Sequence, residues 1–134
     1  MITHQTALLY AMVLVSAADG DMKDRELSRI GEVVRYLPIF QDYDSSRLTG
    51  EARDCANLLA SDDGLERVLD QIVTALPAKL GETAYALACD VAAADGKVTR
   101  EEARLLEMLR NHFQLDNLAA AAIERGAKAR HQTL

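Results

Sequence analysis

The chain has 134 residues, of which 49% are hydrophobic and only 4% aromatic, and its formal net charge is −6. This length suits one domain with a real core, and seven glycines with two prolines are too few for the turns of a β sandwich or barrel. A nucleic-acid partner is not expected, because proteins that neutralise phosphates carry a basic surface. The composition predicts a single all-α domain over residues 1–134 whose partner is a cation or another protein.

Seven segments carry hydrophobic residues at helical spacing and are separated by connections that contain Gly, Pro or Asp. The first segment is apolar almost throughout, which indicates a core helix, and Gly20 follows its end as a helix stop. Pro38 ends the second segment, since the residue before proline is pushed out of the helical region. The predicted helices cover about 4–18, 24–37, 45–61, 65–76, 78–94, 101–113 and 116–128.

Several functional classes lack their sequence signatures. Cys55 and Cys89 are far apart, with no CxxC and no His cluster nearby, so we expect two buried free thiols rather than a zinc or redox site. The apolar run 7–18 lacks a basic region before it and is too short to span a bilayer, so we read it as a buried helix. We expect a cytoplasmic protein with no direct membrane insertion. No nucleophile elbow or phosphate loop occurs, and we expect no enzymatic activity.

The chain contains an internal repeat. A shift of 76 residues lays the segment 15–22 on 91–98, so that the two Ala-Asp-Gly turns coincide and Glu26 meets Glu102. Hydrophobic positions of the following helices also coincide under this shift. The repeat predicts two helical hairpins, at about 8–37 and 84–113, that pack about a pseudo-two-fold axis.

The shared pattern Asp-Gly-x-(Met/Val)-x-x-x-Glu has the shape of the second half of an EF-hand loop. The first and third ligand positions would be Val15 and Ala17 in one copy, and Val91 and Ala93 in the other. Apolar side chains cannot ligate calcium, so we reject the EF-hand interpretation.

A shared cation site is the first of two interpretations that remain open. If the two turns meet, Asp19, Glu26, Asp95 and Glu102 offer up to eight carboxylate oxygens, the ligands that hard divalent cations such as calcium, magnesium or manganese prefer. Four converging carboxylates repel one another unless a cation or a basic group lies among them.

The second interpretation is purely structural. Thr99 and Glu102 have the spacing of a capping box, in which each side chain bonds the backbone of the other residue. Lys23 stands at the position of Thr99 in the first copy and cannot accept such a bond, although Glu26 recurs. The turns can therefore begin helices, hold a cation, or do both.

The two Ala-Asp-Gly turns with their glutamates, and Leu76-Pro77 followed by Glu82-Thr-Ala84, resemble the TerB-like family of tellurite-resistance proteins. The likeness extends over nearly the whole chain. It implies a seven- to eight-helix bundle with pseudo-two-fold symmetry. It also implies a divalent metal site at Asp19, Glu26, Asp95 and Glu102, with Asp90 as a further candidate.

The resemblance implies a role in tellurite and chemical-stress response, or in membrane-associated co-chaperones, with another protein as partner. Two functions follow: a non-enzymatic stress-response protein that binds a divalent cation, or a protein-interaction module whose acidic turns only shape helix ends. A third, reduction of tellurite by Cys55 or Cys89, needs an exposed thiol of low pKa, which their apolar surroundings argue against.

Overall fold

The computed structural model describes residues 1–18, 20 and 22–134 of the chain, and these form seven α helices, three short 3-10 helices and no strand. The all-α prediction is confirmed. The α helices are α1 (His4–Ser16), α2 (Asp24–Tyr36), α3 (Leu48–Leu59), α4 (Gly64–Ala75), α5 (Gly81–Ala93), α6 (Arg100–His112) and α7 (Asn117–Arg130). The 3-10 helices are η1 (Pro38–Phe40), η2 (Ser45–Arg47) and η3 (Ala78–Leu80).

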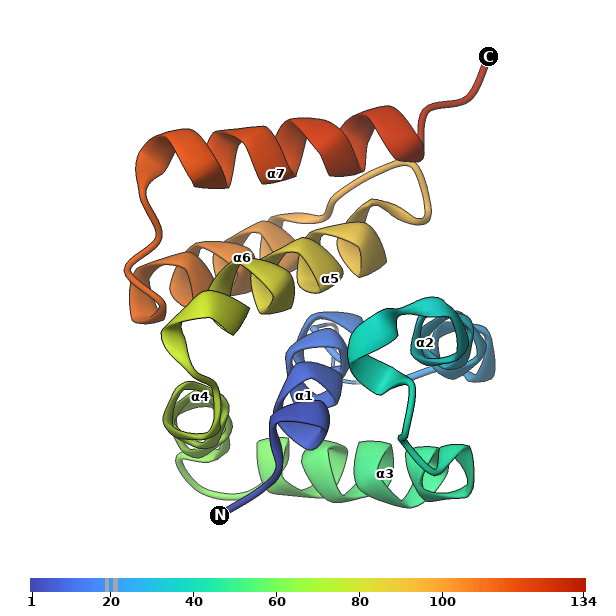
Figure 1. Ribbon diagram of the computed structural model, residues 1–134, viewed down its shortest axis with the longest axis vertical. Helices are drawn as coiled ribbons and strands as arrows, with labels where there is room; N and C mark the ends of the chain where they lie inside the picture. The colour runs from blue at the N-terminus through green and yellow to red at the C-terminus, as the bar shows by residue number, and fades with distance from the viewer. Residues whose placement is uncertain (19, 21) are drawn as a thin grey trace.

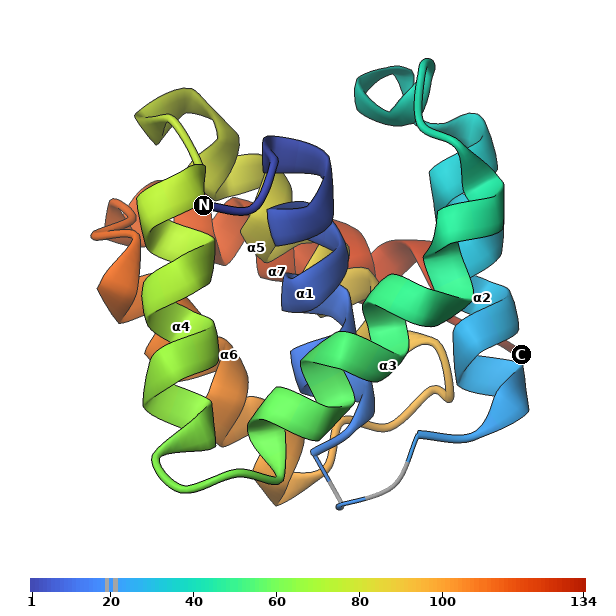
Figure 2. The same ribbon diagram turned by 90° about the horizontal axis from the view of Figure 1, so that it is seen from below.

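Helix α1 is the centre of the core. Every residue from Thr6 to Ser16 is buried, and α2, α3, α4, α5 and α6 all pack against this helix (Figures 1 and 2). A helix that is apolar on all sides has no face to present to water, so its neighbours must surround it. Among the described residues, no helix is long and apolar enough to cross a membrane.

Two predicted helices begin with a 3-10 turn rather than an α turn. Asp44 accepts a hydrogen bond from the Ser46 amide at 3.0 Å, and η2 follows before α3 starts. Pro77 lies before η3, whose last residue, Leu80, donates its amide to the Pro77 carbonyl at 2.9 Å. These turns change the chain direction before each helix and were not expected from hydrophobic spacing, which marks only the buried positions.

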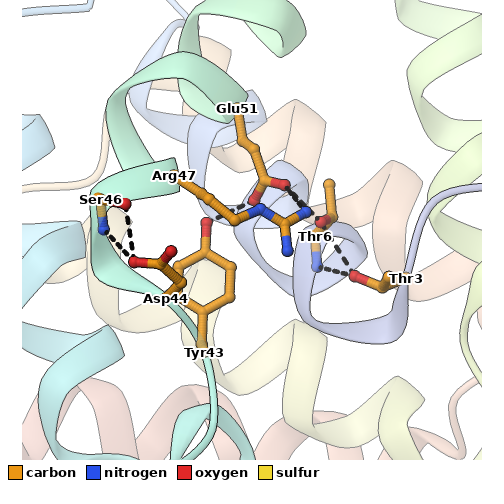
Figure 3. A network of polar contacts seen from close by, with 7 residues as sticks. All are labelled: Thr3, Thr6, Tyr43, Asp44, Ser46, Arg47 and Glu51. Carbon is orange, nitrogen blue, oxygen red and sulfur yellow. Dashed lines mark hydrogen bonds and ion pairs between the residues drawn. The ribbon is translucent and has the colours of Figure 1, made fainter.

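A polar network fixes the connection between α2 and α3 onto the start of α1 (Figure 3). Glu51 of α3 accepts hydrogen bonds from the Thr6 hydroxyl of α1 at 3.1 Å and from Arg47 at 2.6 Å. It also accepts one from the Tyr43 hydroxyl. Burial and this bond raise the pKa of Tyr43, so the phenol remains a donor. Thr3 completes the network by capping α1 through the Thr6 amide.

Helices α3 and α4 approach each other at Gly64. A Cβ atom at this position would lie 2.3 Å from the Leu58 carbonyl oxygen and 2.5 Å from that of Leu59. These atoms belong to the backbone and cannot move aside without shifting α3. At Gly50, in the first turn of α3, a Cβ atom would meet nothing within 4 Å.

We therefore predict opposite effects for two Gly→Ala substitutions. Gly64→Ala should lower the free energy of unfolding by about 2–4 kcal/mol because the backbone must move. Gly50→Ala should raise it by up to about 1 kcal/mol, since alanine restricts the unfolded chain. Urea unfolding monitored by circular dichroism measures both, and equal midpoints for the two variants would contradict the close approach at Gly64.

Candidate functional site

The two Asp-Gly turns have the same backbone closure. The Gly20 amide donates to the Ala17 carbonyl at 2.9 Å, and the Gly96 amide donates to the Ala93 carbonyl at 2.9 Å. Gly20 has φ +91° and Gly96 has φ +79°, values that only glycine adopts readily. Asp19, one of the predicted metal ligands, lies outside the described residues.

The other three predicted ligands line one cleft. Glu26 at the start of α2, Asp95 in the second turn and Glu102 at the start of α6 all border a cavity of about 230 Å³. Both repeats therefore contribute to it, and Val15 and Val91 lie in its wall. Basic side chains also line this cleft, which we call the turn cleft; they are Lys23, Arg25, Arg29 and Lys97.

Arg29 supplies a positive charge to the second turn. Its Nη1 atom lies 2.8 Å from Oδ1 of Asp95, and the two side chains are 35% and 50% exposed. The pair joins α2 to the turn between α5 and α6. The Arg29 guanidinium thus supplies, next to Asp95, the positive charge that reduces repulsion among the carboxylates. A bound cation is not needed for this purpose.

Glu102 is held by the capping box of α6. Its carboxylate accepts the Thr99 amide at 2.8 Å, and the Thr99 hydroxyl accepts the Glu102 amide at 3.1 Å. The predicted box is confirmed. At the start of α2, Lys23 has a similar extended backbone but makes no side-chain capping bond. Glu26 occupies the third position of α2, as Glu102 does in α6.

No metal-binding group is formed by the residues that the structure describes: no three of their His, Cys, Asp and Glu side chains are placed to hold one ion. Asp90, the further candidate, contacts the last helix instead. Its Oδ1 accepts from Arg130 at 2.7 Å and lies 3.4 Å from Nε2 of His131. The metal site remains a prediction that requires Asp19 and a rearrangement at Asp95.

Both cysteines are buried free thiols, as expected from their apolar surroundings. Burial raises the pKa of Cys55 and of Cys89 to about 12. At neutral pH both side chains are therefore protonated, and a protonated thiol is a poor nucleophile and reductant.

The residue that sequence reasoning missed is Arg29. It lies three residues after Glu26, so the two side chains share one face of α2. This spacing could have predicted a basic side chain beside the acidic residues. The ion pair itself depends on how α2 packs near α5, which no local pattern encodes.

Comparison with protein-family models, with curated protein sequences and with solved structures found no match. Membership of the TerB-like family therefore stays a prediction that rests on the two turns and their glutamates.

The unequal caps of α2 and α6 generate a prediction. Thr99→Ala should lower the free energy of unfolding by about 0.5–2 kcal/mol because it removes a capping acceptor. Lys23→Thr should raise it by about 0.5–1 kcal/mol, since φ −84° and ψ 157° at Lys23 match the capping geometry of Thr99 at φ −74° and ψ 165°. Thermal and urea unfolding give both values. A Lys23→Thr variant no more stable than the natural chain would show that α2 does not start as α6 does.

Thiol reactivity gives a second prediction. With pKa values of about 12, only about one thiol in ten thousand is ionised at pH 8. Iodoacetamide should label the folded protein at least about 100-fold more slowly than the urea-unfolded chain, as followed by mass spectrometry. Rapid labelling of either cysteine in the folded protein would contradict this and reopen thiol chemistry as a function.

Proposed function

We propose that this chain is a non-enzymatic, TerB-like stress-response protein of the cytoplasm that acts through contact with another protein, with its Asp-Gly turns as structural elements. The proposal rests on the partners that the carboxylates of the turn cleft have within the chain. Asp95 is paired with Arg29, and Glu102 bonds the backbone of Thr99. Each carboxylate already has a partner within the chain, so neither depends on a metal ion.

The charges that line the turn cleft support the same proposal. Its described lining has four basic and three acidic side chains. A site that selects divalent cations usually presents an excess of carboxylate oxygens, because the ion's own charge must be balanced. A mixed rim is instead typical of a surface that forms ion pairs within the protein or with a protein partner.

We also propose that the hairpins α1–α2 and α5–α6 are related by a pseudo-two-fold axis. Matching turn hydrogen bonds and positive φ values at Gly20 and Gly96 support this. The C-terminal ends of α1 and α5 both reach the turn cleft, through Val15 and Val91. Such an arrangement explains why two identical turns recur 76 residues apart in one chain.

Divalent-cation binding is the second candidate function. It is favoured by one observation, the convergence of Glu26, Asp95 and Glu102 on the same cleft. In this case a calcium, magnesium or manganese ion competes with Arg29 for Asp95, and Asp19 completes the ligands. Cation binding and the Arg29–Asp95 pair would then exclude each other.

Titration of the protein with CaCl₂ and MnCl₂, by calorimetry and NMR, separates the two functions. We predict no saturable binding at millimolar concentrations for the natural chain. Arg29→Gln removes the positive partner of Asp95, so it is the variant in which weak cation binding would be detected first. Arg35→Gln, at the exposed far end of α2, is the matched control. Saturable binding by the natural chain that Asp95→Asn abolishes would establish the cation function instead.

The cellular role requires a separate readout. In the source cell, deletion of the gene should reduce survival on tellurite, and the natural chain should restore it. The combined Asp19→Asn and Asp95→Asn variant should restore survival equally if the turns are structural, provided that its unfolding midpoint is unchanged. Deletion without any effect on tellurite or oxidant survival would contradict the stress-response role.

A further inference from the structure

A groove separate from the turn cleft lies between α6 and α7. Both helices pack against α5, which forms the floor, while contacts between α6 and α7 are sparse (Figure 1). The resulting cavity has a volume of about 540 Å³, within the range of sites for small organic molecules. We call it the α6–α7 groove.

The buried part of the groove lining is apolar and comes from α5, α6 and α7. Ala127 and Cys89 are 3% and 4% exposed, and Leu106 is 9% exposed. The high pKa of Cys89 keeps its thiol neutral, so no charge lies at the bottom. At the rim, Val98 is 44% exposed, which places an apolar side chain where a bound molecule would cover it.

The two ends of the groove differ in charge. At the end near the start of α5, Tyr85 donates to Glu124 at 2.6 Å, and Arg110 lies 3.8 Å from the same carboxylate oxygen, so the charges there are balanced. At the other end, the loop between α5 and α6 comes close to the C-terminal turn of α7 (Figures 1 and 2). Lys128 and His131 line this end.

Lys128 is the charged residue of the lining at the loop end. The nearby Asp90 carboxylate is paired with Arg130 and lies 3.4 Å from His131. The acidic residues of the lining are Glu107 and Glu124, which sit further along α6 and α7 from the loop. The ammonium of Lys128 also lies in the last turn of α7, where the helix dipole adds negative rather than positive potential. A ligand anion therefore depends on the side chains themselves, because the potential of the helix end opposes it.

We propose that the α6–α7 groove binds a small amphipathic carboxylate, with its apolar body over Leu106 and Ala127 and its anionic group beside Lys128. Lining residues of α6 extend from Ala103 to Arg110, a rise of about 10 Å, which matches a short acyl chain. Burial of that chain supplies the affinity, and the lysine sets the orientation.

The first repeat provides an internal comparison. Ala17, Gly20 and Met22, each 76 residues before a lining residue of the groove, border a cavity of about 440 Å³ beside α3. Its charged lining includes Asp24 next to Lys23, as well as Arg53. With two basic residues and one acid, this cavity is the competing site, and a ligand bound there would be detected at α2 and α3 instead.

Sodium octanoate, used below its micelle concentration, is the probe, and calorimetry with amide NMR is the measurement. We predict saturable binding with Kd about 0.1–1 mM and chemical-shift changes concentrated in α5, α6 and α7. Lys128→Gln should weaken octanoate binding about three- to tenfold but leave binding of 1-octanol unchanged. Ala103→Trp, which places an indole at the groove wall, should abolish binding of both.

Ala121→Trp is the matched control, because Ala121 is an exposed residue of α7 outside the groove lining. It should bind octanoate as the natural chain does. All variants are first compared by circular dichroism and unfolding midpoint. Absence of saturable octanoate binding would overturn the proposal. Equal loss of octanoate binding in the two tryptophan variants would also overturn it, as would chemical-shift changes that cluster at α2 and α3.

Discussion

The packing of α1 is the constraint on which the rest of the structure depends. This helix has no polar face: from Ala7 to Val15 each side chain is at most 6% exposed. Five helices pack against it, and α5 makes extensive contact with it. Both helices end at the turn cleft, where Glu26, Asp95 and Glu102 border one cavity. The geometry of the site is thus a consequence of core packing rather than of the turn residues alone.

The turn cleft illustrates how a protein can collect carboxylates without a metal ion. Repulsion among converging acids is removed by any positive charge that lies among them, and a guanidinium is sufficient. Arg29 has this role at Asp95, where it also joins α2 to the turn between α5 and α6. Exposed pairs of this kind contribute little free energy, about 0–1 kcal/mol. Their importance here is that they compete with an external cation for the same oxygen atoms.

The sequence predicted the seven helices because core-facing residues recur at helical spacing, and it predicted the capping box because Thr99 and Glu102 interact locally. It did not predict Arg29 as the partner of Asp95, since 66 residues separate them and only α2 packing brings them together. The contact at Gly64 and the α6–α7 groove were also missed, because each depends on how two helices pack. Close approach and empty volume are properties of helix pairs, and no single helix encodes them.

The central claim is that α2, α5 and α6 form one cooperative unit around α1, so that the turn cleft is formed before any ligand binds. Native-state hydrogen exchange tests this most directly. We expect the amides of Leu8–Leu14 in α1 and of Tyr85–Cys89 in α5 to exchange only through global unfolding, with one shared free energy that equals the value from urea unfolding. A lower free energy for α5 than for α1, or the reverse, would show that one of the two helices opens without the other and would contradict the account.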